Sequence, residues 1–217
     1  MRGWVLAVGA AVLGVAVSGG TVWAEGERAG DFDYYVMSLS WSPAWCALTG
    51  DGRGDPQCDA GDGRGWVLHG LWPQYDQGWP SYCRTGQRDP SRGETAAMAD
   101  IMGGSGLAFY QWKKHGRCSG LAASGYFNTA RLAFEAVVMP PVFDDVAKDL
   151  VVPAEVIEAA FIESNPGLVA NQITVICDKG LIAEVRMCLT KDLVPRGCGV
   201  DVVRDCQIED AGLEALR

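Results

Sequence analysis

Hydrophobic and polar positions divide the chain into a strand-rich start, a helical middle and a strand-rich end. Strands are predicted where aromatic and β-branched residues form short apolar runs, at 31–41, 66–68, 172–177 and 181–189. Helices are predicted between capping, glycine and proline signals, at about 91–102, 107–114, 124–139 and 153–163. The Gly- and Asp-rich residues 51–64 predict a surface loop, and 178–180 predict a hairpin turn. This order favours an α+β fold, in which helices pack around an antiparallel β-sheet core.

The first 24 residues have the pattern of a secretory signal peptide. Arg2 supplies a positive start, residues 4–17 are uncharged and apolar, and 22–24 (VWA) form a small-x-small cleavage site. The apolar stretch is shorter than the ~20 residues that a membrane-spanning helix needs. We therefore expect cleavage after residue 24 and one domain over 25–217, secreted or periplasmic, without stable membrane association.

Composition and charge narrow the class of protein. The chain has 217 residues, of which 48% are hydrophobic and 21% charged, as in an ordinary globular domain and unlike a disordered chain. Its formal charge of −9 argues against a broadly basic nucleic-acid-binding surface, although it leaves room for a local basic site.

The eight cysteines all follow the predicted cleavage site, and in an exported chain an even number indicates disulfides. Because no two of them are closer than eight residues, a CxxC-type zinc site is not indicated. We expect four disulfides, no metal and no cofactor; the spacing alone allows all 105 pairings.

The two histidines are the clearest candidates for catalytic residues. A lone histidine is more often structural, but His69 and His115 each lie in a turn-bounded segment with flanking aromatic residues. Gln111, Lys114 and His115 have i, i+3, i+4 spacing and share one face of a predicted helix. Two imidazoles suit RNA cleavage, which needs a base for the ribose 2′-OH and an acid for the leaving 5′-oxygen. A lysine would neutralise phosphoryl charge, and the internal 2′-OH nucleophile requires no metal.

Two sequence motifs resemble those of a known protein family. Residues 68–73 (LHGLWP) and 112–118 (WKKHGRC) resemble the two active-site segments of the ribonuclease T2 family, which are secreted acid endoribonucleases. Residues 38–46 resemble that family's first strand, and 184–188 (EVRMC) its late strand, so the similarity runs from about 33 to 206. The resemblance implies an α+β fold and cleavage of single-stranded RNA through a 2′,3′-cyclic phosphate, with low base specificity.

The resemblance also implies roles for individual residues. His115 would be the general base, His69 the general acid and Lys114 the residue that stabilises the pentacoordinate phosphorane. Trp72 would stack on a base. Three nearby aromatic residues either complete this stacking platform or serve ordinary loop packing: Tyr75, Trp79 and Tyr82.

The second active-site segment departs from the family pattern. The second segment usually carries His-Glu before its tryptophan, whereas this chain has Tyr110 and Gln111. Gln111 can donate a hydrogen bond to a phosphate but cannot transfer a proton, so we expect activity to persist with an altered rate or pH profile. The expected disulfides are Cys46–Cys58, Cys83–Cys118, Cys177–Cys206 and Cys188–Cys198. The last two are nested, which resembles the family frame.

Two other classes of protein remain as alternatives. A catalytically impaired RNA-binding or inhibitory module on the same disulfide scaffold would account for Gln111, although the intact His69, Lys114 and His115 argue against it. A disulfide-rich structural protein of the cell envelope would leave both histidine motifs unexplained. We expect a monomer that acts on single-stranded RNA and not on DNA, because DNA lacks the 2′-OH.

Overall fold

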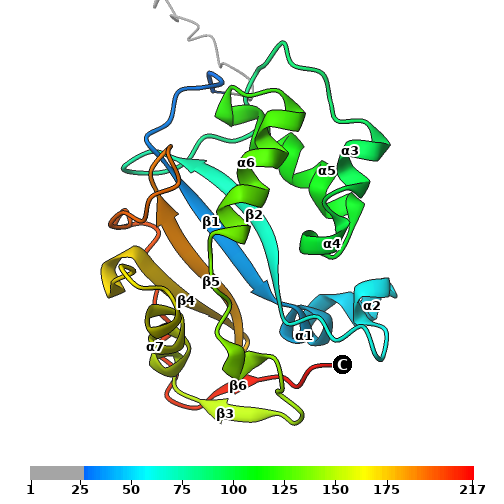
Figure 1. Cartoon of the computed structure of the whole chain (residues 1–217), viewed down its shortest axis with the longest axis vertical. Helices are drawn as coiled ribbons and strands as arrows, with labels where there is room; N and C mark the ends of the chain where they lie inside the picture. Colours follow the sequence, from blue (N-terminus) through cyan, green and yellow to red (C-terminus); the bar gives the residue numbers. More distant parts are fainter. Residues whose placement is uncertain (1–26) are drawn as a thin grey trace, which may run out of the picture.

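A computed structural model describes residues 27–217, and the predicted signal peptide lies outside them. The core element is one sheet with strand order β2-β1-β5-β6-β3, and β4 also pairs with β5 (Figure 1). Its strands are β1 (Tyr34–Trp41), β2 (Trp66–Gln74), β3 (Leu150–Val152), β4 (Ile173–Asp178), β5 (Leu181–Leu189) and β6 (Ala211–Leu213). All eight residues of β1 are buried, and this strand pairs on both sides, with β2 and with β5.

Helices surround this sheet. They are α1 (Ser42–Trp45), α2 (Asp51–Arg53), α3 (Arg92–Ala96), α4 (Ala99–Met102), α5 (Ser105–Lys114), α6 (Ala123–Glu135) and α7 (Ala154–Ser164). Helices α3 to α6 gather beside β2, α7 lies beside β4, and α1 and α2 follow the end of β1 (Figure 1). No helix within residues 27–217 combines the length and the apolar character needed to cross a membrane. The α+β fold class is therefore confirmed.

The core joins the sheet to the helices through aromatic side chains. Trp41 and Trp66 face each other from β1 and β2, with ring centroids 5.1 Å apart, and Phe161 of α7 meets Trp66 edge to face at 5.4 Å. Tilted and edge-to-face pairs of this kind are the favoured arrangements of aromatic rings. This cluster fixes β2, and with it the segment that carries His69.

Strand β2 is longer than the sequence predicted. It continues past Leu68 to Gln74 and includes Gly70 and Pro73, which we expected to form a turn. Pro73 lacks an N–H for the ladder, but β2 is an edge strand with a partner on one side only, and such strands tolerate proline.

The helical boundaries differ from the predictions in three places. The capping box of Ser91 and Glu94 is present, but the helix expected over 91–102 is broken at residues 97 and 98 into α3 and α4. Helix α5 begins at Ser105, inside the glycine run that we expected to separate helices. Helix α6 ends at Glu135, because the Asn165 side chain bonds both backbone groups of Val138, at 2.8 and 2.9 Å, and draws residues 136–139 out of the helix.

Short elements add details that the hydrophobic pattern did not indicate. The predicted loop 51–64 contains α2 and a 3₁₀ turn at Pro56–Cys58. Strands β3 and β6 were not predicted, and β6 joins β5 through a parallel bridge at Leu181 and Gly212 within an otherwise antiparallel sheet. Four disulfides join the pairs expected from the sequence: Cys46–Cys58, Cys83–Cys118, Cys177–Cys206 and Cys188–Cys198.

Candidate active site

A β-bulge presents His69 at the edge of the sheet. Ser38 of β1 pairs with Gly70 and Leu39 pairs with Leu68, so His69 is the extra residue between them. A bulge bends its strand and re-aims a side chain, which is why bulges are frequent beside functional sites. The His69 side chain is 32% exposed, so it can meet a ligand while most of it remains held by the protein.

A carboxylate from β5 holds the His69 ring. Glu184 Oε1 lies 2.6 Å from His69 Nδ1, and Glu184 Oε2 accepts hydrogen bonds from Arg186 Nε at 2.9 Å and Nη2 at 2.6 Å. Burial alone would raise the pKa of the Glu184 carboxyl, but the hydrogen bonds and charges of His69 and Arg186 together lower it to about 2. Glu184 therefore stays ionised in acid.

The end of α5 supplies the second histidine. His115 is the C-terminal cap of this helix, and its backbone N–H donates to the Gln111 carbonyl at 2.9 Å. The next position requires glycine, because a Cβ on Gly116 would lie 2.8 Å from the rings of Trp112 and Tyr126. The His115 side chain is buried, and its Nδ1 has no hydrogen-bond partner among residues 27–217. Burial, with the positive charges of Lys114 and His69, lowers the pKa of His115 from 6.5 to about 3.

Trp72 connects the two histidines. Its ring centroid lies 5.3 Å from that of His69, edge to face, and 5.2 Å from that of His115, in a stacked arrangement. Trp72 Nε1 donates a 2.7 Å hydrogen bond to Gln111 Oε1. A Cβ on Gly70 would come within 2.3 Å of that oxygen and 2.4 Å of Trp72 Nε1, so the contact requires glycine at this position.

Lys114 lies at the junction of α5 with the loop before Cys83. Its backbone carbonyl accepts a hydrogen bond from the Tyr82 N–H at 2.8 Å, and its Nζ lies 5.9 Å from the centre of the Tyr110 ring. The Cys83–Cys118 disulfide ties the same loop to the turn that follows His115. Lys113, by contrast, is paired with Asp89 at 2.9 Å.

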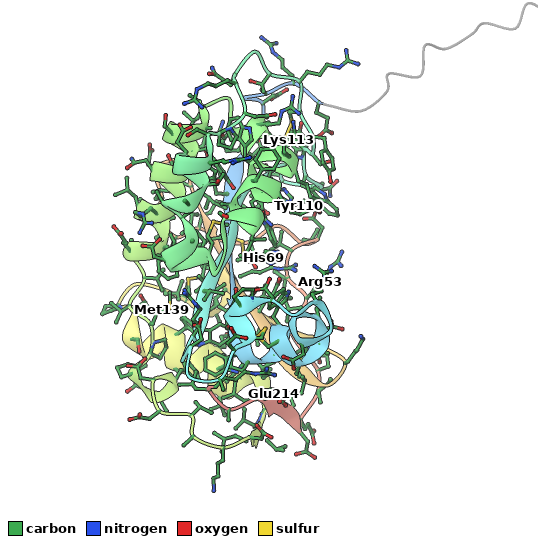
Figure 2. All side chains as sticks on the ribbon, turned by 90° about the vertical axis from the view of Figure 1, so that its right-hand side faces the viewer. Arg53, His69, Tyr110, Lys113, Met139 and Glu214 are labelled. Carbon is green, nitrogen blue, oxygen red and sulfur yellow. A yellow bond between two sulfur atoms is a disulfide. The ribbon has the colours of Figure 1, made fainter. Side chains whose placement is uncertain are left out.

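A cleft of about 920 Å³ opens beside His69. It is lined by the segment after β1, by the α4–α5 turn and by residues of β4 and β5, among them Asp178, Glu184 and Arg186. Tyr110, His69 and Arg53 follow one another along the same side of the molecule (Figure 2). Trp72, Lys114 and His115 are not among the residues that line this cleft, whereas His69 lines it and contacts Trp72.

The three other aromatic residues of the predicted stacking platform differ in how exposed their side chains are. Trp79 and Tyr82 are 50% and 42% exposed, whereas Tyr75 is partly buried against the hydrophobic core. The two exposed side chains therefore present more surface for stacking on a base than Tyr75 does.

The structure gathers several of the predicted residues and adds two that the sequence analysis did not single out. The structure brings His69, Trp72, Gln111 and His115 into contact, although Gln111 is buried against Trp72. Glu184 and Arg186 were not predicted as site residues. Their i, i+2 spacing on a strand places them on one face, and an acidic and a basic residue at such spacing in an apolar strand is the signal that could have indicated them. Residues 27–217 contain no group of three or more His, Cys, Asp or Glu side chains arranged to hold a metal ion.

Comparisons with known proteins agree with this fold. The model of the Ribonuclease T2 family matches residues 32–198, and the chain belongs to this family. A ribonuclease of Aeromonas hydrophila is 44% identical over 109 residues, which make up 50% of this chain and 47% of that protein. A probable ribonuclease of Haemophilus influenzae is 34% identical over 120 residues, 50% of this chain and 44% of that protein, so the chain spans about half the length of these relatives.

The fold is also similar to that of RNase NT, solved in complex with 5′-AMP. The TM-score is 0.54 at 22% sequence identity, and the match covers 78% of this chain and 96% of that one.

Proposed function

We propose that this protein is a T2-type endoribonuclease that cleaves single-stranded RNA by acid–base catalysis with His69 and His115. The observation that carries the proposal is the packing of both histidine rings on Trp72, within 5.3 Å between ring centroids, beside Lys114 at the end of α5. Membership of the Ribonuclease T2 family supports the same reaction class.

In the first step His115 accepts the proton of the ribose 2′-OH. The 2′-oxygen attacks the adjacent phosphorus, the bond from phosphorus to the 5′-oxygen breaks, and His69 gives its proton to that oxygen. The products are a 2′,3′-cyclic phosphate and a free 5′-hydroxyl. Lys114 stabilises the additional negative charge on the pentacoordinate phosphorane.

The environment of His115 suits a general base. A base must be unprotonated before the reaction, and burial keeps the pKa of His115 near 3, so the ring is neutral in mildly acidic solution. In the second, slower step the roles reverse: His69 takes a proton from water, the water oxygen opens the cyclic phosphate, and His115 protonates the departing 2′-oxygen.

The substrate crosses the site at His69. One nucleotide occupies the cleft of about 920 Å³, and its neighbour stacks on the exposed aromatic residues Trp79 and Tyr82, with Trp72 and Tyr75 completing the platform. RNase NT, a protein of similar fold, was solved in complex with 5′-AMP, which supports nucleotide binding by this fold. Stacking without base-edge contacts gives low base specificity.

The remaining expectations belong to the same proposal. Residues 25–217 form one domain that acts as a secreted or periplasmic monomer after removal of residues 1–24, and the four disulfides suit an oxidising compartment. The internal 2′-OH nucleophile makes the reaction independent of a metal ion, and DNA is not a substrate.

Digestion of yeast RNA by the purified protein in the presence of EDTA tests this function. We expect the wild type to produce oligonucleotides with 2′,3′-cyclic phosphate ends and to leave single-stranded DNA intact. His69→Ala and His115→Ala should each lose activity by about 10²- to 10⁴-fold. RNA binding without cleavage would instead support the impaired RNA-binding module, and loss of wild-type activity in EDTA or full activity of His115→Ala would overturn the mechanism.

A further inference from the structure

The Glu184 carboxylate is shared between one proposed catalytic histidine and one arginine. Both of its oxygens are used, since Oε1 contacts His69 and Oε2 accepts two hydrogen bonds from Arg186. Among residues 27–217, Glu184 is the one carboxylate within hydrogen-bonding distance of either histidine ring. Helix α5 supplies no such group, because its neighbouring side chains there are Tyr110 and Gln111.

The register of the β-strands sets the position of the hydrogen bonds among His69, Glu184 and Arg186. In β5, Ala183 is left out of the pairing with β4, since Ile176 pairs with Glu184 and Cys177 pairs with Ile182. A second bulge therefore lies next to Glu184, as the first lies at His69. The Glu184 side chain is only 14% exposed, and a buried carboxylate without a role at the site would cost desolvation energy for little gain in stability.

Arg186 links the carboxylate to the rest of the site. Its guanidinium carbon lies 5.2 Å from the centre of the Trp72 ring, and the same ring packs on His69 and His115. The charged groups around His69 come from several elements: Glu184 and Arg186 from β5, His115 from the end of α5, Arg53 and Asp55 across the cleft and Asp178 from β4. Of these, only Glu184 bonds the ring directly.

We propose that Glu184 is the positioning residue of His69 and that Arg186 keeps this carboxylate ionised in acid. The proposal deepens the proposed function and rests on the role of His69 in RNA cleavage. Glu184 accepts the Nδ1–H of His69, which fixes the ring orientation and leaves Nε2 as the nitrogen that exchanges the proton with the 5′-oxygen. Arg186 acts through Glu184, and neither residue needs to touch the substrate.

The tautomer of His69 tests the proposal without any activity measurement. Because the chain has only two histidines, their ring nitrogens can be resolved by ¹⁵N NMR of the folded protein. We expect neutral His69 to carry its proton on Nδ1 in the wild type and in Asp178→Asn, the matched control. Asp178 is a carboxylate of the same cleft that does not contact His69. Glu184→Ala should lose this preference.

Kinetics separate positioning from a merely structural role. Glu184→Ala should lower kcat by about ten- to a hundredfold with little change in KM, since proton transfer as a whole contributes about 10²- to 10⁴-fold. Glu184→Gln keeps an oxygen acceptor without the charge and should lie between Glu184→Ala and the wild type. Arg186→Met removes the charge that lowers the pKa of Glu184, so the acid limb of the kcat profile should move to higher pH.

The outcomes that overturn the proposal are distinct from those that overturn the function. A wild-type His69 protonated on Nε2 when neutral would refute the positioning role, even if every variant failed to fold. Unchanged tautomer and kcat in Glu184→Ala would do the same. An inactive wild type with His69 protonated on Nδ1 would remove the proposed function and leave the contact between Glu184 and His69 intact.

Discussion

At the scale of single residues, the two histidines differ in what surrounds their rings. His115 is 5% exposed and lies close to positive charge, whereas His69 reaches the cleft and contacts a carboxylate. The low pKa of His115 keeps this ring neutral in mildly acidic solution, as a general base requires, while the Glu184 carboxylate holds the ring of His69.

The low pKa of His115 predicts a pH dependence of stability. Its pKa is about 3 in the folded chain against a usual value of 6.5, so between these limits the unfolded chain binds more protons. The free energy of unfolding should fall as pH falls through this window, with a slope of up to about 1.4 kcal/mol per pH unit from this residue. Urea denaturation of wild type and His115→Gln should show a flatter profile for the variant, most clearly between pH 6.5 and 4.5, above the usual pKa of Glu184. Parallel profiles would contradict the burial of a neutral His115.

Gly70 is predicted to be required by the contact between Trp72 and Gln111. A Cβ would come within 2.3 Å of Gln111 Oε1, so Gly70→Ala must displace one of the two side chains. We expect a loss of about 1–3 kcal/mol in the free energy of unfolding, typical of overpacking. Activity should fall by roughly a hundredfold if Trp72 moves by about 1 Å and the histidines move with it.

Gly86→Ala is the matched control for Gly70→Ala, because no atom lies within 4 Å of the added Cβ. Both variants can be compared by denaturant unfolding and by kcat on RNA. Equal stability and activity of the two variants would show that Trp72 and Gln111 do not need their present arrangement.

At the scale of elements, α5 and the loop before Cys83 hold the helical half of the site together. The Cys83–Cys118 disulfide and the hydrogen bond from Tyr82 N–H to the Lys114 carbonyl fix this loop on both sides of His115. Replacing both cysteines by serine should destabilise the protein by about 2–4 kcal/mol and lower kcat by on the order of a hundredfold.

The Cys177–Cys206 disulfide provides a control for that prediction. It joins β4 to the C-terminal segment, and neither cysteine contacts a histidine. Its double serine variant should lose a similar amount of stability while kcat stays within about threefold of wild type. If the two variants had equal kcat, the loop before Cys83 would not position the site.

Helices and strands could be predicted where the sequence pattern that specifies them lies within the element itself. The hairpin of β4 and β5 was predicted closely, because an alternating apolar pattern and the turn at Lys179 and Gly180 are both local. The full length of β2 was not predicted from the sequence. It depends on pairing with β1 at the edge of the sheet, where a strand that contains proline is tolerated. Strands β3 and β6 are three residues each and exist only through pairing between distant segments.

The same distinction applies to the site. His69, Lys114 and His115 lie in short motifs that can be read from the sequence. Glu184 meets His69 across 115 positions of the chain, through two bulges whose register no local pattern indicates. Long-range partners of this kind are set by the tertiary fold.

At the scale of the whole molecule, we propose that RNA cleavage depends on a division of the acid and base roles between His69 and His115. A protein with a formal charge of −9 gains little from general attraction to RNA, so we expect cleavage to depend on this local arrangement. The claim can be tested by changing how readily the 5′ group leaves. An ordinary dinucleotide needs a proton on its departing oxygen, whereas 4-nitrophenolate leaves without one.

The decisive measurement is kcat of the wild type, His69→Ala and His115→Ala on a dinucleotide and on uridine 3′-(4-nitrophenyl phosphate). His69→Ala should lose about 10²- to 10⁴-fold on the dinucleotide but less than about tenfold on the nitrophenyl ester, because the second reaction needs no general acid. His115→Ala should lose activity on both substrates, because each still requires a base at the 2′-OH. Equal losses of His69→Ala on the two substrates, or an unimpaired His115→Ala on either, would contradict the account.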